Sequence, residues 1–95
     1  MWIEYQYPEP RTIGSAEVYW AKDAGGRGCE PPASWSLQWW DGSAWKPVAG
    51  VTQYPTELDK FNRVRFTRVQ SKAIRLLATG QDRQPVGILE WRVNE

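Results

Sequence analysis

The chain has 95 residues, enough for one small domain with a thin core. Twelve basic residues against eleven acidic ones leave a net charge of +1, which disfavours bulk electrostatic binding to nucleic acid or to an anionic membrane surface. Histidine is absent, which removes Ser-His and Cys-His nucleophile pairs. The single cysteine, Cys29, excludes an internal disulfide and a zinc cluster.

No apolar run approaches the roughly 20 residues of a membrane-spanning helix. The first ten residues, MWIEYQYPEP, lack the basic head and apolar stretch of a signal peptide. Long linkers, repeats and low-complexity stretches are also missing. We therefore expect residues 1–95 to form a single domain.

Apolar residues alternate with polar ones along the chain, which predicts strands and no helix. The first strand covers residues 2–7 and is closed by Pro8 and Pro10. The second covers residues 12–20. One face of this second strand carries Ala16, Val18 and Trp20.

Residues 34–48, SWSLQWWDGSAWKPV, predict a β-hairpin, because Asp41-Gly42 separates two aromatic runs and glycine tolerates the positive φ of a tight turn. The first strand of the hairpin places Trp35, Leu37 and Trp39 on one face. The chain holds seven tryptophans. A small sheet protein with so many indoles has rings available to stack on a ligand, which favours a binding module over an enzyme.

Three further strands are predicted at residues 62–67, 73–79 and 88–93. Val64 and Phe66 point inward and Arg63, Arg65 and Thr67 outward. Ile74, Leu76 and Ala78 share a face, as do Leu89, Trp91 and Val93. About seven short strands separated by turn signals are typical of an antiparallel sandwich, here of jelly-roll type.

The connections between these strands differ in length. If consecutive strands are antiparallel, the short connections 7–13, 41–44 and 69–72 meet at one end of the sandwich. The long connections 22–33, 50–61 and 80–87 then meet at the other end. Long loops on a rigid sheet scaffold are a common way to build a binding site.

The long connections carry an aromatic ring and planar polar groups, the combination that recognises the apolar face and the hydroxyls of a sugar. Tyr54, beside Pro55, is predicted to be exposed and to stack on the ring. Arg27 and Arg83 would donate to hydroxyls, and Asp23 and Asp59 would accept from them. The predicted ligand-binding residues are Asp23, Arg27, Glu30, Tyr54, Asp59, Lys60, Gln81 and Arg83.

Three alternatives remain open at this point. Carboxylates of the long connections could form a glycosidase pair, although ordinary solvated charge is the simpler interpretation. The basic run RVRFTRVQSKAIR at residues 63–75 could bind nucleic acid, but its Phe66 points inward, away from stacking bases. An exposed patch formed by Trp40 and Tyr19 would favour packing against another protein domain.

Five stretches follow one another in a recognisable order: WIEYQY before two prolines, EVYW, PASWSLQWWDGSAWKPV, FNRVRFTRVQSKAIRLLAT and GILEWRV. Their order and spacing resemble the discoidin or coagulation-factor type C domain, a galactose-binding-like family. The closest variant is similar to modules appended to bacterial glycosidases. The resemblance implies a jelly roll that binds glycan without catalysis, as part of a larger periplasmic, cell-surface or secreted bacterial protein.

The resemblance also implies a structural calcium site, to which Glu90 matches one ligand. Members of the family carry a segment ahead of the strand at residues 2–7, which supplies one strand and most calcium ligands. Without it, this chain is not expected to complete a cage of about six to eight oxygens. The missing strand would leave an open sheet edge, which favours pairing with another chain, and the sequence leaves the oligomeric state open.

Overall fold

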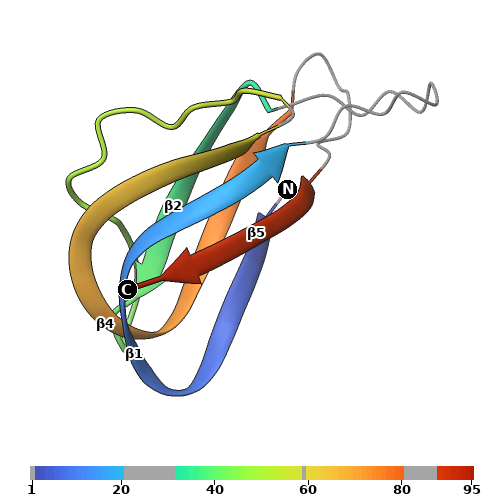
Figure 1. Cartoon of the computed structure of the whole chain (residues 1–95). Coiled ribbons are helices and arrows are strands. Elements are labelled where there is room, and N and C mark those ends of the chain that lie inside the picture. Colours follow the sequence, from blue (N-terminus) through green and yellow to red (C-terminus); the bar gives the residue numbers. More distant parts are fainter. Residues whose placement is uncertain (1, 21–31, 59, 81–87) are drawn as a thin grey trace.

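The computed structural model describes residues 2–20, 32–58, 60–80 and 88–95. It contains five strands: β1 (Trp2–Trp20), β2 (Ser34–Trp40), β3 (Trp45–Pro47), β4 (Phe61–Thr79) and β5 (Ile88–Asn94). All neighbouring strands are antiparallel, in the order β3-β2-β4-β1-β5 (Figure 1). The described residues include no helix, so none that could cross a membrane. The all-β prediction is confirmed.

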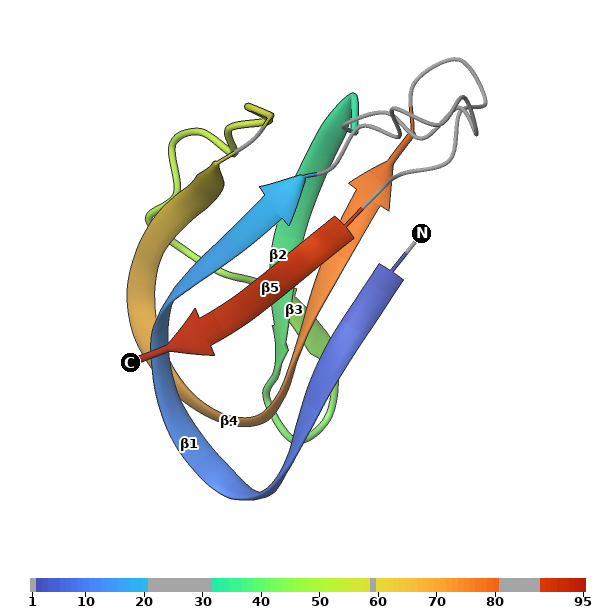
Figure 2. The same cartoon turned by 45° about the vertical axis from the view of Figure 1, so that its right-hand side comes forward.

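β1 and β4 pair along their lengths and bend together (Figure 2). Their ladder runs from Trp2 opposite Leu77 to Gln6 opposite Ala73, is interrupted, and resumes with Arg11 opposite Ser71. Residues 7–10 therefore form a bulge, in which Pro8 and Pro10 have no N–H to donate to the ladder. The predicted strands at 2–7 and 12–20 are the two arms of one bent strand. The predicted connections 7–13 and 69–72 are bends within β1 and β4.

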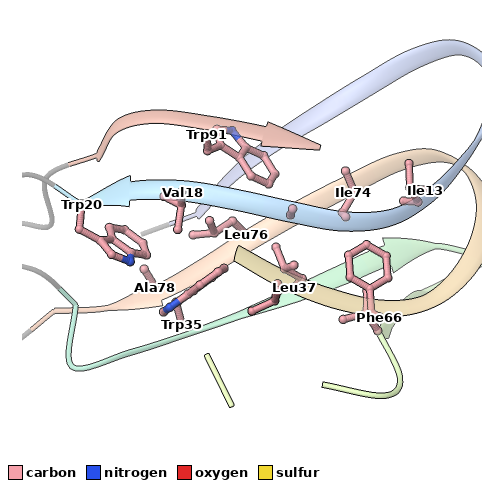
Figure 3. Close-up of a cluster of buried hydrophobic side chains, with 13 residues drawn as sticks. Ile13, Val18, Trp20, Trp35, Leu37, Phe66, Ile74, Leu76, Ala78 and Trp91 are labelled. Carbon is pink, nitrogen blue, oxygen red and sulfur yellow. The ribbon is translucent and has the colours of Figure 1, made fainter. Parts of the chain in front are cut away.

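The bend divides the sheet into two layers that face each other. The first layer contains β3, β2, the second arm of β4 and the first arm of β1. The second layer contains the first arm of β4, the second arm of β1, and β5. Figure 3 shows side chains of the two layers pointing toward one another.

The core between the layers follows the predicted alternation. The fully buried side chains include Trp20 and Val18 from the second layer and Leu37, Ile74 and Leu76 from the first. The indoles of Trp20 and Trp35 meet edge to face across the layers, 5.5 Å apart. Trp91 is also buried and Trp39 packs at the edge of the core, so four tryptophans are core residues as predicted.

The connection between β3 and β4 covers part of this core. Val48 is buried, and Val51, Tyr54 and Leu58 pack against the core cluster. Asn62, itself buried, holds the end of the segment. Its Oδ1 accepts the N–H of Glu57 (2.8 Å), and its Nδ2 donates to the carbonyls of Glu57 (2.8 Å) and Lys60 (3.1 Å). The segment has no strand, as predicted, but it is packed down rather than extended into solvent.

The strand ends that flank the long connections, except the end of β3, gather at one end of the sandwich, which we call the rim. Trp20 stands opposite Ile88, and the N–H of Ala33 donates to the carbonyl of Thr79 (2.8 Å). The start of β4, Phe61, stands opposite Tyr19. The bends and the hairpin turn lie at the opposite end (Figure 2). The predicted shared end is therefore confirmed for both ends of the connections 22–33 and 80–87 and for the end of the connection 50–61. The start of 50–61 lies away from the rim, because the carbonyl of Ala49 accepts the N–H of Thr67 (2.8 Å), near the bend of β4.

The β2–β3 turn is closed by Asp41. Its Oδ1 accepts the N–H groups of Ser43 (2.7 Å) and Ala44 (2.8 Å), and its Oδ2 pairs with the ammonium of Lys46 (2.8 Å). Gly42 takes the positive φ of 102° that the sequence predicts for this turn. The hydrogen bond from Lys46, followed by those from Ala44 and Ser43, lowers the pKa of Asp41 to about 2.

Replacing Asp41 with Asn tests this turn, because Asn keeps the Oδ1 acceptor but lacks the charge. A carboxylate with a lowered pKa stabilises the fold above its unfolded-state pKa of about 4, and this stability is lost as pH falls through the folded value. We expect wild type to be more stable than Asp41→Asn above pH 4, with the difference shrinking toward pH 2. Urea unfolding followed by tryptophan fluorescence from pH 2 to 6 measures it; a pH-independent difference contradicts the assignment.

Asn62→Ala tests the anchoring of the β3–β4 connection. The variant leaves the backbone groups of Glu57 and Lys60 without their partner, so we expect the free energy of unfolding to fall by about 2 kcal/mol. Asn94→Ala, at an exposed position of β5, is the control and is expected to change stability by less than about 0.5 kcal/mol. Equal effects of the two variants would show that Asn62 does not hold the connection.

Candidate functional site

Tyr54 lies near the rim but is half-buried, whereas the sequence predicted an exposed stacking ring. The indole N–H of Trp35 donates to the carbonyl of Pro55 (2.7 Å), which draws the segment onto the core. The Tyr54 ring then packs edge to face on Trp35 (4.9 Å), and its hydroxyl accepts the N–H of Leu37 (3.3 Å). Burial raises the pKa of Tyr54. Its role toward a ligand stays a prediction.

Lys60 is the other predicted binding residue that the structure describes. It is exposed beside Phe61, at the start of β4, and pairs with Glu57 (3.1 Å). The remaining members of the set lie outside the described residues: Asp23, Arg27, Glu30, Asp59, Gln81 and Arg83. The structure thus shows where their segments join the sheet, and the composition of a rim site remains a prediction.

Glu90, the predicted calcium ligand, is exposed on β5. Its Oε1 pairs with the guanidinium of Arg92 at 2.9 Å. Across the described ranges, no group of three or more acidic or cysteine side chains gathers to hold a metal ion. The described surroundings of Glu90 therefore do not fit a calcium cage.

The outer face of the first layer carries a second cluster of aromatic and polar side chains. The guanidinium of Arg75 lies over the ring of Trp45, 4.3 Å from its centroid, and 5.7 Å from the centroid of Trp2. Nε and Nη2 of Arg75 donate to Oε1 of Gln38, at 2.8 and 2.6 Å. These bonds fix the guanidinium between two indoles, of which Trp2 is 57% exposed.

A groove of about 470 Å³ adjoins this cluster, and we call it the outer groove. Its lining residues come from β1, β2, β3 and β4: Glu4, Gln6, Tyr7, Trp40, Trp45, Lys72 and Ala73. None of these lining residues belongs to the binding set predicted from the sequence. The available signal was the position of Trp40, out of phase with the core face of its strand, together with Trp45 across the turn.

The structure also describes two other surfaces considered from the sequence, the pair Trp40 and Tyr19 and the basic run at residues 63–75. Trp40 packs on Trp45 in the first layer, whereas Tyr19 packs on Phe61 in the second. Trp40 and Tyr19 therefore do not form a common patch. In the basic run, Phe66 is buried as predicted, and Arg63 is paired with the largely buried carboxylate of Glu17 (3.2 Å).

The fold is similar to solved structures of carbohydrate-active proteins. A structure from a study of the Streptococcus pneumoniae β-galactosidase BgaA matches with a TM-score of 0.85 and 16% identity, over 99% of this chain and 68% of that chain. A pectin-binding carbohydrate-binding module matches with a TM-score of 0.69 and 21% identity, over 99% of this chain and 66% of that one.

Chitosan-binding module 2 of a chitosanase/glucanase from Paenibacillus sp. IK-5, solved with chitotriose, matches with a TM-score of 0.70 and 18% identity, over 99% of this chain and 69% of that one. No protein-family model and no curated protein matches the sequence. The chain thus has the fold of these modules and spans about two thirds of their lengths.

The variants Tyr54→Phe and Tyr54→Ala distinguish the contribution of the Tyr54 hydroxyl to stability from that of its ring. Loss of the acceptor for the Leu37 N–H is expected to cost about 1 kcal/mol of unfolding free energy. Tyr54→Ala also removes the ring from Trp35 and should cost about 3 kcal/mol. Urea unfolding measures both. Tyr19→Phe is the control, since no described residue hydrogen-bonds the Tyr19 hydroxyl; a larger effect of Tyr19→Phe than of Tyr54→Phe would contradict the assignment.

Proposed function

We propose that this chain is a non-catalytic carbohydrate-binding module that serves a larger bacterial glycosidase in the periplasm, at the cell surface or in the medium. The observation that carries this function is that Trp20, Ala33, Phe61, Thr79 and Ile88, where long connections join the sheet, share one rim of a rigid sandwich. The fold shared with pectin- and chitosan-binding modules supports the same function.

At the rim, the glycan would be held by the residues predicted from the sequence. Arg27 and Arg83 donate to hydroxyl groups, and Asp23 and Asp59 accept from them. Tyr54 contacts the glycan with the exposed part of its ring only, because another part of the ring is packed on Trp35. Contacts of this kind are individually weak, so we expect a Kd between about 1 μM and 1 mM.

The first arm of β1 supports a second candidate function, packing against another domain or chain. Within the described residues, β5 pairs only with residues 15–20 of β1, which leaves residues 2–6 with β4 as their single neighbour. Ile3 (38%) and Tyr5 (37%) are exposed although they lie on the inner face of the layer. An open strand edge beside apolar side chains favours the addition of a partner strand.

A glycan array with the whole chain tests carbohydrate binding at the rim. We expect binding to at least one glycan, and at least a tenfold loss for the double variant Arg27→Ala/Arg83→Ala, because two charged donors are removed. Arg65→Ala, an exposed arginine near the bend of β4, is the matched control and should bind like wild type.

Two outcomes would contradict this function or its placement. Failure of the wild type to bind any glycan, in an assay where a known module binds, would favour domain packing. Full binding by the double variant would remove Arg27 and Arg83 from the site. Size-exclusion chromatography with light scattering, on wild type and Tyr5→Lys, tests the packing function: an oligomer that dissociates in the variant supports it.

A further inference from the structure

We propose that the outer groove is a second carbohydrate site, which binds internal units of an unbranched, neutral pyranose chain. The proposal rests on the proposed glycan-binding function but uses none of the rim residues. The volume of the outer groove, about 470 Å³, lies within the range of about 300–1,000 Å³ usual for small-molecule sites.

The shape of the groove follows from one small side chain. Ala73 stands opposite Gln6 in the ladder between β1 and β4, and the side chains around it are larger. Its methyl group therefore forms the floor, with Trp40 and Trp45 on one side and Glu4 and Gln6 on the other. The floor and both walls belong to β-strands, so the site is built on the rigid part of the domain.

The aromatic wall is held in place before any ligand binds. The rings of Trp40 and Trp45 meet edge to face at 5.5 Å, on the two strands that Asp41 joins. Arg75 supports Trp45 from beside the groove and is itself fixed by Gln38. A fixed indole presents an apolar plate on which the C–H face of a pyranose stacks at low entropic cost.

The polar wall offers acceptors and a donor toward the same space. Gln6 Nε2 donates to Oε2 of Glu4 (2.8 Å), which orients the pair. Within the described residues, Oε1 of Glu4 and the ammonium of Lys72 have no hydrogen-bond or ion-pair partner, so they are available to sugar hydroxyls. Glu4 and Lys72 carry opposite charges, and a neutral ligand matches this balance.

Trp2 extends the face beyond the groove and indicates a chain rather than a single sugar. It is the most exposed of the large apolar residues, and it lies on the same side of β1 as Glu4 and Gln6. The guanidinium of Arg75 lies between Trp2 and Trp45. A pyranose chain placed in the groove can therefore reach a second stacking ring at Trp2.

Titration of the ¹⁵N-labelled chain tests this site, with the indole N–H signals as the readout. The probes are neutral hexasaccharides (cellohexaose, β-1,4-galactohexaose and maltohexaose), an oligogalacturonate and a chitosan oligomer. We expect at least one neutral probe to shift the Trp45 and Trp40 signals, with a Kd that changes less than twofold in 0.5 M NaCl. Ala73→Leu fills the floor, and we expect it to weaken this binding at least tenfold.

Trp45→Ala should have the same effect as Ala73→Leu, and Arg65→Ala and the rim double variant Arg27→Ala/Arg83→Ala should leave the groove signals unchanged. If Trp45→Ala unfolds, Ala73→Leu and Lys72→Ala decide the result.

Binding that only the rim variant abolishes would overturn the groove site while keeping the proposed function. No binding to any probe or array glycan would overturn both. If only the charged probes bind, and 0.5 M NaCl abolishes that binding, the proposal of a neutral ligand is wrong.

Discussion

The antiparallel ladder between β1 and β4 is the interaction on which the rest of the structure depends. It joins residues that are far apart in the chain, from Trp2 opposite Leu77 to Tyr19 opposite Phe61. Because both strands bend at the bulge around Pro8 and Pro10, one ladder supplies strands to both layers. The core, the rim and the outer groove all lie where that bend places them, so one strand pairing positions both of the proposed binding surfaces.

Specific hydrogen bonds then position the β3–β4 connection and the Arg75 side chain, which the backbone ladder does not fix. Asn62 and the bond from the Trp35 indole to the Pro55 carbonyl bind the β3–β4 connection to the core. Arg75 is placed between two indoles by its bonds to Gln38. Such partly buried bonds stabilise modestly, by about 1 kcal/mol each, but leaving one partner unpaired costs more. They therefore act mainly to select one arrangement of each surface.

Much of the fold could be predicted from the alternation of side chains, including the inward positions of Val18, Leu76 and Trp91 and the hairpin at Asp41. Bends could not be distinguished from turns, because a sharply bent strand reverses direction as a turn does. The burial of Tyr54 depends on the hydrogen bond from the Trp35 indole to the carbonyl of Pro55, twenty residues further along the chain. The outer groove was missed because it joins Gln6 to Ala73, a pairing distant in sequence that local patterns do not specify.

The sharing of β1 and β4 between the layers has a mechanical consequence. Neither layer can separate from the other without breaking strands that run through both, so partial opening is confined to β2, β3, β5 and the connections. The domain should lose its structure in one cooperative step. Under the proposed function, force on a bound polysaccharide would load the whole sandwich rather than one detachable sheet.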